Sequence, residues 1–469
     1  MLVFLLAVGP WLFTRYPRHN LTAEQTLKAK NDVRTTLVQA FVGLAVASGA
    51  IVTYRTFSQN RREHDRSYEL RQAEQINEFF ATAVDQLGHQ HAPVRLGALY
   101  SLVQLAQANP PQRASVVDVI CGYLRMPYTP APPPVAAAKP PPLAELPPAP
   151  AAKPPPLAGL PLRPAAAPAD DGDAQQELQV RLTAQRLLAA HLRPPDSHHG
   201  AALDASPSNH FWPGVILDLV GATLVDFDLR EASLSTARFD GASFTGDTSF
   251  VQTTFTSDAH FVGAAFGGRA RFVDTEFLGG ASFDRARFAA STRFDGAHFH
   301  GDAHFEGATF TGDARFTRAR FAQGTLFRGA TFAGDAMFGH AAFTGSAVFA
   351  KCTFSDLTRF ADATFDGVAE FAEATFAGIA RFGGTQFNRT VQFREATFVS
   401  GAQFDEATFA DDTGLRLARV LHLDDPDLNK PGGGARRIWP ENWKVRAGWD
   451  DPTQGTLVRT TRPTPRAQS

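Results

Sequence analysis

Five arginines recur in the second half of the chain at multiples of 22 residues. They are Arg271, Arg293, Arg315, Arg359 and Arg381, with Met337 in the one intervening position. Guanidinium groups bind carboxylates and phosphates through charge-assisted, often bidentate hydrogen bonds, so arginines aligned on one surface would form an anion-binding row. Duplication of a solvated arginine whose stem packs on a flat surface would give the same spacing without any ligand. Both interpretations need a fold that stacks these positions.

A second group of candidate residues contains histidine. His298, His300 and His304 lie close in sequence, and Glu276 and Arg320 are each 22 residues from His298. Histidine and carboxylate side chains are Zn²⁺ ligands, but in a coiled fold we expect the three histidines to project from different columns or faces. Two cysteines are too few for a Cys-rich zinc site or a disulfide framework. We therefore expect no metal site and no cofactor.

The sequence contains no recognisable catalytic motif. We find no P-loop, GxSxG, HExxH, paired-cysteine or dinucleotide-binding fingerprint. We therefore expect no catalytic residues and no enzyme. The net charge of −2 gives no overall attraction to nucleic acid or to a membrane surface, so nucleic acid is not an expected partner.

Phenylalanine dominates residues 244–415. One set falls on every eleventh residue from Phe244 to Phe409, and a second set keeps the same period from Phe250 to Phe404 and closes at Leu415. Together they take 31 of the chain's 40 phenylalanines, and a small residue, usually alanine, lies two positions before each. This period fits neither a helix nor a simple strand alternation, so it indicates an internal repeat. Two periods reproduce the 22-residue spacing of the arginines.

The segment Leu37–Tyr54 is the best candidate for a membrane span. Its 18 residues carry no charge, and a helix of that length is roughly 27 Å long, close to the hydrocarbon thickness of a bilayer. A buried helix of a soluble protein is the alternative. Met1–Phe13 is also apolar but has only 13 residues, so it is a second, weaker candidate for membrane contact.

The charges that flank the candidate span do not orient it. Five Lys or Arg residues lie close to it on each side, so the positive-inside rule is tied. Low cysteine content is typical of a reducing compartment, and we expect a cell-membrane protein whose repeat domain lies on the cytoplasmic side. Small residues spaced four apart would let a second helix approach and predict self-association through the span. These pairs are Gly43 with Ala47 and Ala45 with Gly49.

Composition divides the chain into six segments. Residues 127–174 are a Pro/Ala-rich linker, because 17 prolines favour extended polyproline II over packed structure. We expect membrane-anchoring helices at 1–55, a small helical module at 56–126, and a helix with an irregular connector at 175–210. The repeat domain spans 211–420, and a C-terminal tail at 421–469 contains tryptophans that could cover the last coil.

The repeat resembles the pentapeptide-repeat family in a Phe-rich variant. The likeness lies in a central Leu or Phe with a small residue two before it, as in Ala222-Thr-Leu224 and Ala308-Thr-Phe310. It implies a mainly β fold, a right-handed quadrilateral β-helix with four repeats per coil and Phe pointing inward. The chain more widely resembles membrane-anchored pentapeptide-repeat proteins of high-GC bacteria. That likeness rests on GPWLFTR (9–15), LTAEQTLKAKNDVRTTL (21–37), VRLGALYSLVQLA (94–106) and FWPGVILDLVGATLVDFDL (211–229).

These features together predict a non-enzymatic, membrane-tethered scaffold or protein-interaction module. Its partner would be a protein, acidic where it meets the arginine row. The resemblance supplies an alternative, because some pentapeptide-repeat proteins inhibit DNA gyrase by mimicking DNA with an acidic rod. The repeat domain is mildly acidic, which agrees with this alternative. The arginine row and the candidate membrane span argue against it.

Overall fold

The computed structural model describes residues 22–130, 169–195, 210–410, 413–414, 418–422, 437–440, 443–449 and 451–459. Met1–Phe13, most of the proline-rich linker and the glycines at 432–434 lie outside the described residues. The chain divides into two compact units, Met1–Thr82 and Ala83–Ser469.

One long helix, α2 (Ala23–Leu87), contains the candidate membrane span. It continues without a break past residue 55. Its segment Ala23–Phe57 is long and apolar enough to cross a membrane, and Leu37–Tyr54 lies inside that segment. Large apolar side chains such as Leu44 and Val46 are about two-thirds exposed, at 71% and 67%.

Three further helices form a small bundle. They are α3 (Ala92–Ala108), α4 (Arg113–Arg125) and α5 (Ala169–Leu192), and a 3-10 turn, η1 (Pro110–Gln112), joins the first two. Glu177 of α5 links all three helices: its carboxylate accepts hydrogen bonds from Arg95 of α3 at 3.0 Å, Tyr123 of α4 at 2.8 Å and Arg181 of its own helix at 2.7 Å. The helix that follows the proline-rich linker thus packs against those that precede it.

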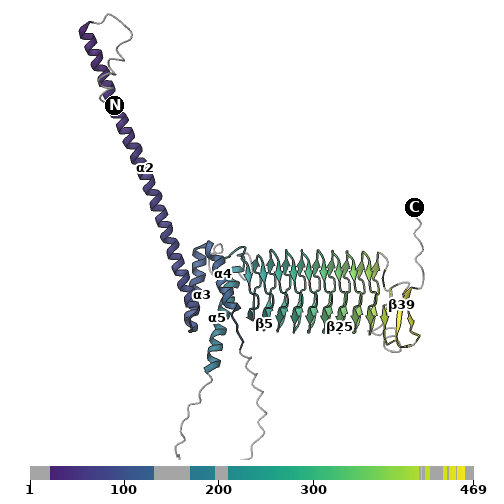
Figure 1. Ribbon diagram of the computed structural model, residues 1–469. Helices are drawn as coiled ribbons and strands as arrows, with labels where there is room; N and C mark the ends of the chain where they lie inside the picture. The colour runs from purple at the N-terminus through teal and green to yellow at the C-terminus, as the bar shows by residue number, and fades with distance from the viewer. Residues whose placement is uncertain are drawn as a thin grey trace, which may run out of the picture. The chain divides into compact units, whose positions relative to one another are not determined.

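The repeat domain is a solenoid of four parallel sheets and about nine turns (Figure 1). Sheet A contains β1 (Leu217–Asp218), β4 (Ala237–Arg238), β8 (Ala259–His260), β12 (Ala281–Ser282), β16 (Ala303–His304), β20 (Thr325–Leu326), β24 (Ala347–Val348), β28 (Ala369–Glu370), β32 (Val391–Gln392) and β36 (Thr413–Gly414). Sheet B contains β2 (Thr223–Val225), β5 (Ser243–Thr245), β9 (Ala265–Phe266), β13 (Arg287–Phe288), β17 (Thr309–Phe310), β21 (Thr331–Phe332), β25 (Thr353–Phe354), β29 (Thr375–Phe376), β33 (Thr397–Phe398) and β37 (Arg419–Val420).

The other two sheets complete each coil. Sheet C contains β6 (Thr248–Ser249), β10 (Ala270–Arg271), β14 (Thr292–Arg293), β18 (Ala314–Arg315), β22 (Ala336–Met337), β26 (Thr358–Arg359), β30 (Ala380–Arg381) and β34 (Ala402–Gln403). Sheet D contains β3 (Ser233–Leu234), β7 (Thr254–Phe255), β11 (Glu276–Phe277), β15 (His298–Phe299), β19 (Arg320–Phe321), β23 (Ala342–Phe343), β27 (Thr364–Phe365), β31 (Gln386–Phe387) and β35 (Thr408–Phe409).

The coil length follows the spacing of the apolar residues. In the first coil Leu217 pairs with Ala237, a step of 20 residues, because the leucines there recur every five. Ala237 then pairs with Ala259, and this step of 22 continues to the pairing of Thr397 with Arg419. The predicted stacking of residues 22 apart is confirmed.

Stacked phenylalanines form the core of the solenoid. Both sets from Phe244 to Phe398 are at most 1% exposed, and each such burial contributes about 1.5–3 kcal/mol. Rings one coil apart lie nearly parallel, with centroids 4.5 Å apart for Phe244 and Phe266 and 5.2 Å apart for Phe360 and Phe382. Rings of neighbouring corners meet edge to face. The small residue two positions before each ring is also buried, because the interior has room for one large side chain per corner.

Both ends of the solenoid are covered. At the N-terminal end the Gln185 side chain of α5 donates to the Val225 carbonyl of β2 at 2.8 Å and accepts from the Val225 N–H at 3.1 Å. At the C-terminal end Trp439 lies on the rings of Phe398 and Phe404, at 5.4 and 6.2 Å. The prediction that the tail covers the last coil is confirmed for Trp439.

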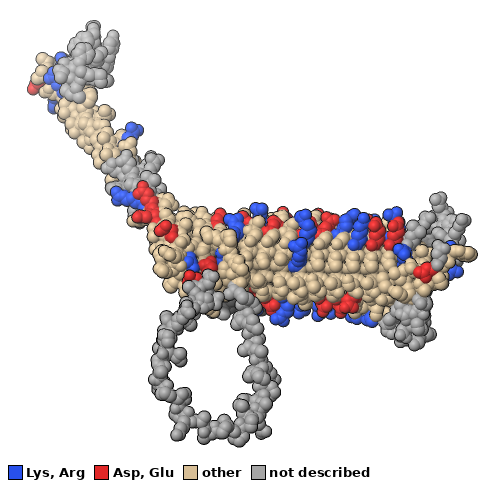
Figure 2. All heavy atoms as spheres, turned by 60° about the horizontal axis from the view of Figure 1, so that its bottom comes forward, with Lys and Arg blue, Asp and Glu red and all other residues tan. Residues whose placement is uncertain are grey.

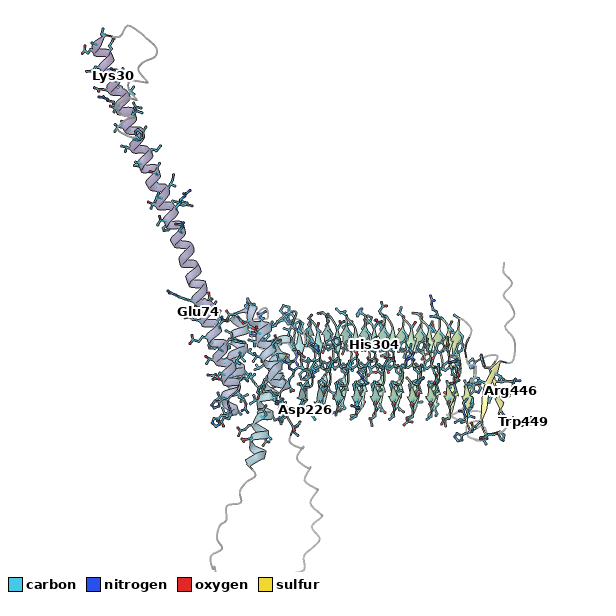
Figure 3. The ribbon with its side chains drawn as sticks, in the orientation of Figure 1. Lys30, Glu74, Asp226, His304, Arg446 and Trp449 are labelled. Atoms are coloured by element: carbon cyan, nitrogen blue, oxygen red, sulfur yellow. The ribbon has the colours of Figure 1, made fainter. Side chains whose placement is uncertain are left out.

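A β-hairpin extends the C-terminal end. Its strands β38 (Trp443–Ala447) and β39 (Gly455–Arg459) are antiparallel, and β39 pairs with β37 of the solenoid (Figure 1). Trp449 belongs to the turn of this hairpin and is 99% exposed (Figure 3). The expectation that Trp449 helps cover the last coil is therefore wrong, because a hairpin turn carries it into solvent.

Candidate functional site

The five predicted arginines lie in one row on sheet C. Arg271 pairs in register with Arg293, Arg293 with Arg315, and Arg359 with Arg381, while Met337 connects Arg315 to Arg359. Neighbouring strands of a sheet are about 4.8 Å apart, so successive guanidinium groups of the row are close neighbours. Figure 2 shows basic and acidic side chains interleaved in rows along the solenoid, with neutral surface between them.

The N-terminal half of the arginine row is neutralised by aspartates. Asp295 contacts Nε of Arg293 at 2.7 Å and Nε of Arg315 at 3.5 Å. Asp247 contacts Arg271 at 3.4 Å and Arg269 at 2.7 Å, and the hydrogen bond from Arg269 holds the pKa of the Asp247 carboxyl below its ordinary value. Asp295 thus offsets the repulsion between Arg293 and Arg315.

Asp313, which lies two positions before Arg315, has a different role. Its carboxylate accepts a hydrogen bond from the backbone N–H of Asp335 at 3.2 Å, and no ion pair joins it to the arginine row among the described residues. Burial raises the pKa of the Asp335 carboxyl, and the nearby carboxylates of Asp356 and Asp313 raise it further.

The C-terminal half of the row lacks such partners. Within the part of the chain that the structure describes, Arg359 and Arg381 form no ion pair, and Nε of Arg381 is buried without a hydrogen bond. The reason lies in the flanking sequence. Two positions after Arg293 stands Asp295, whereas the equivalent neighbours of Arg359 and Arg381 are Ala361 and Gly383.

The small flanking side chains leave a groove over this half of the row. Its volume is about 730 Å³, and Arg315, Met337, Arg359 and Arg381 lie along it. Carboxylates from both sides also line it: Asp313, Asp335, Asp362, Asp405 and Glu406. The guanidinium groups in the middle of this groove can bind an anionic group of a ligand, and the carboxylates around them can bind cationic groups of the same ligand. The carboxylates would repel a continuous polyanion.

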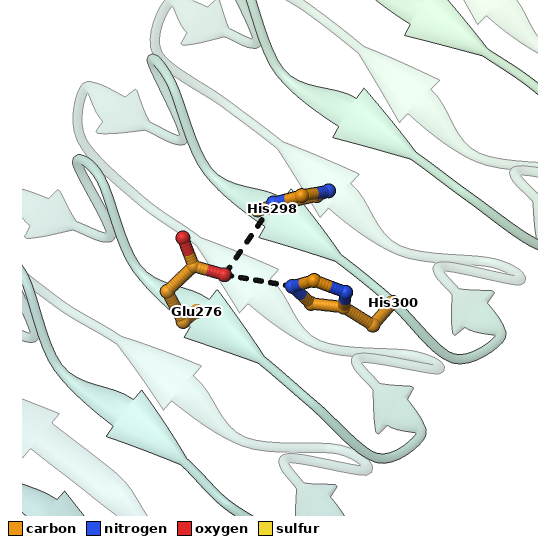
Figure 4. Close-up of side chains that lie close together, drawn as sticks. All are labelled: Glu276, His298 and His300. Carbon is orange, nitrogen blue, oxygen red and sulfur yellow. Dashed lines mark hydrogen bonds and ion pairs between the residues drawn. The ribbon is translucent and has the colours of Figure 1, made fainter.

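A second arrangement on the solenoid corrects the expectation for the histidines. His298 and His300 lie on the same outer surface, with ring centroids 3.9 Å apart, because they flank the inward-pointing Phe299 and alternate residues of a strand share a face. The carboxylate of Glu276, on the adjacent strand β11, contacts His298 Nδ1 at 3.4 Å and His300 Nε2 at 2.8 Å (Figure 4).

His304 lies apart from this cluster. It belongs to β16 of sheet A, where it pairs in register with Ser282 and Leu326 (Figure 3). The expectation of different columns or faces therefore holds for His304. His298 and His300 also occupy different columns, but both project from the same face beside Glu276. The predicted column of Glu276, His298 and Arg320 is confirmed, but sequence reasoning missed that His300 joins it. The signal was the two-residue spacing of the histidines.

The three donor atoms of Glu276, His298 and His300 all lie within 4.8 Å of one another. Burial lowers the pKa of His298, and the neighbouring His300 lowers it further, while Glu276 opposes the shift. Histidine binds a metal ion in its neutral form, because one ring nitrogen then has a free lone pair to donate to the ion.

Comparison with known proteins assigns the repeat domain. Residues 229–276, 272–320, 305–353, 349–397 and 371–419 match the family model described as pentapeptide repeats (9 copies). No curated protein and no solved structure matches the chain. The stacked coils and the family match agree, and residues 229–419 are a pentapeptide-repeat domain.

Proposed function

We propose that this protein is a non-enzymatic, membrane-tethered scaffold that binds a protein partner in the groove of the arginine row. The observation that carries the proposal is the pair Arg359 and Arg381, which lie in an open groove without carboxylate partners among the described residues. Like charges aligned on neighbouring strands repel each other, and the carboxylates that line the groove form no ion pair with Arg359 or Arg381 among the described residues. A ligand that neutralises these guanidinium groups would therefore stabilise the surface. A protein carboxylate is the ligand that fits.

The charges around the groove favour a protein over a lipid or nucleic-acid ligand. A peptide can present a carboxylate to the arginines and lysine or arginine side chains to the surrounding acids, such as Asp362 and Glu406. A phosphate backbone would meet those same acids with repulsion. No observation favours the gyrase-inhibitor alternative, since the arginine row interrupts the acidic surface that DNA mimicry requires.

The tether in this proposal is the segment Ala23–Phe57 of α2. Among the described residues, leucine and valine side chains of this segment such as Leu44 and Val46 are exposed, and a bilayer would supply an apolar environment for them. The helical bundle, which follows α2 in the chain, would then connect the solenoid to the membrane segment. We place the solenoid on the cytoplasmic side, consistent with the low cysteine content.

The partner proposal is tested by quantitative proximity labelling with the full-length protein in its native host. The variant carries Arg359→Ser and Arg381→Ser, and the matched control carries Arg238→Ser and Arg287→Ser, which are exposed arginines of sheets A and B. We expect labelling of specific proteins to fall at least tenfold in the groove variant and to persist in the control. Equal labelling by both variants would refute a role for the groove.

The tether is tested separately by membrane fractionation. The wild-type protein should sediment with membranes, resist carbonate extraction and dissolve in detergent. A variant with Val42→Arg and Val46→Arg should lose membrane association, because two charges near the centre of the span cost several kcal/mol. Recovery of the wild-type protein in the soluble fraction without detergent would refute tethering and leave the groove proposal intact.

A further inference from the structure

We propose that Glu276, His298 and His300 form a binding site for a divalent transition-metal ion of the Zn²⁺ class on sheet D. Two imidazoles and one carboxylate are a ligand set that Zn²⁺ accepts, with the remaining coordination position left to solvent. This inference is independent of the groove proposal.

The donor atoms are close enough for small side-chain movements to bring them around one ion, since all three lie within 4.8 Å of one another. Glu276 Oε2 lies 3.4 Å from His298 Nδ1 and 2.8 Å from His300 Nε2. Metal–ligand bonds of about 2.0–2.2 Å in tetrahedral geometry place neighbouring donor atoms roughly 3.3–3.6 Å apart. The first distance already falls in that range. The second needs an increase of roughly 0.5–0.8 Å, which partly exposed side chains can make.

The backbone that carries the three ligands is rigid. His298 N–H donates to the Thr275 carbonyl and His300 N–H donates to the Phe277 carbonyl, each at 2.9 Å. Behind them the ring of Phe277 stacks on that of Phe299 at 4.7 Å in the core. The ligands therefore have their backbone positions fixed before any ion binds, which lowers the entropic cost of forming the site.

The surrounding charges define the expected strength of binding. Glu276 is the one anion among the ligands, and its register neighbour on the other side, Thr254, is uncharged. Arg320 lies in register with His298 on β19. Its positive charge repels a cation that binds nearby. We therefore expect moderate affinity, which removal of Arg320 should increase.

The test is titration of the full-length, tag-free protein in detergent with Zn²⁺, after treatment with a chelator, followed by calorimetry. Co²⁺ provides a spectroscopic readout of coordination geometry. We expect saturable binding of one ion, at least a tenfold loss of affinity for His300→Ala and for Glu276→Gln, and a severalfold gain for Arg320→Ala. The matched control is His304→Ala, a partly exposed histidine on sheet A that should leave binding unchanged.

Two results would overturn the proposal. One is the absence of saturable binding by the wild-type protein. The other is binding that persists in His300→Ala but disappears in His89→Ala, because His89 and His91 form another histidine pair with ring centroids 5.1 Å apart. Far-UV circular dichroism of each variant checks that the solenoid is intact, as expected for substitutions outside the Phe core.

Discussion

Truncation of one central phenylalanine ring should destabilise the solenoid far more than the same truncation at its end. The Phe316 ring is completely buried and stacks on Phe294 and Phe338, each at 4.8 Å. Edge contacts join it to Phe305 and Phe327 at 5.6 and 5.4 Å. Phe→Ala in a packed core costs about 3–5 kcal/mol, and the rigid neighbours here cannot collapse into the space. We expect about 4 kcal/mol for Phe316→Ala.

Phe409 provides the comparison at the end of the stack because it lies in β35, the last strand of sheet D, where it pairs in register with Phe387. It is partly exposed, and its ring has a stacked neighbour, Phe387 at 5.2 Å, on one side only among the described residues. With less area to lose and solvent nearby, Phe409→Ala should cost about 1–2 kcal/mol. The difference between the two substitutions isolates the contribution of two-sided stacking.

The assay is urea unfolding of the full-length protein in detergent, followed by far-UV circular dichroism. Repeat proteins can open coil by coil, so hydrogen exchange of the amides in residues 294–338 gives the local free energy. Phe316→Ala should speed exchange throughout that segment, and Phe409→Ala should affect the last coil alone. Equal costs for the two substitutions, or a cost below about 1.5 kcal/mol for Phe316→Ala, would refute the stacking argument.

Two further substitutions test other parts of the molecule. Glu177→Ala should destabilise the helical bundle by about 3–5 kcal/mol, because it leaves the buried charge of Arg181 without its carboxylate and removes the hydrogen-bond acceptor of Tyr123. Limited proteolysis of α5 measures this loss of stability, and unchanged protection of α5 from the protease would contradict the prediction. Gln252→Gly should stabilise the solenoid by about 0.5–1 kcal/mol, since Gln252 has a φ of +56° that glycine adopts without strain. Gln252→Ala is its control in thermal unfolding, and an equal gain there would show that backbone strain is not the cause.

The solenoid was predictable from the sequence because its core repeats with the coil. Each phenylalanine, together with the small residue two before it, must occupy the same corner in every turn, so the eleven-residue period fixes which residues stack. That is why the arginine row and the column of Glu276, His298 and Arg320 were predicted correctly. The change from a 20- to a 22-residue coil also follows the spacing of the apolar residues.

The period does not determine which surface charges meet. Asp295 neutralises Arg293, while Ala361 and Gly383 leave Arg359 and Arg381 without carboxylate partners among the described residues. Whether a carboxylate contacts an arginine depends on how far the two side chains extend toward each other from neighbouring columns. The same is true of His300, which joins a column two residues away because its imidazole extends toward Glu276 on the next coil.

The sequence by itself thus determined the repeat, its buried residues and the columns on its surface. In a stack of equal coils, the spacing of two residues along the sequence fixes whether they lie one above the other. Tertiary structure alone decided the contacts that join distant segments. Glu177 meets Arg95 across 82 residues of sequence and Tyr123 across 54, and Trp439 reaches the end of the Phe stack. No local period encodes these contacts, because they arise from the need to cover the two open ends of the solenoid and to satisfy buried charges.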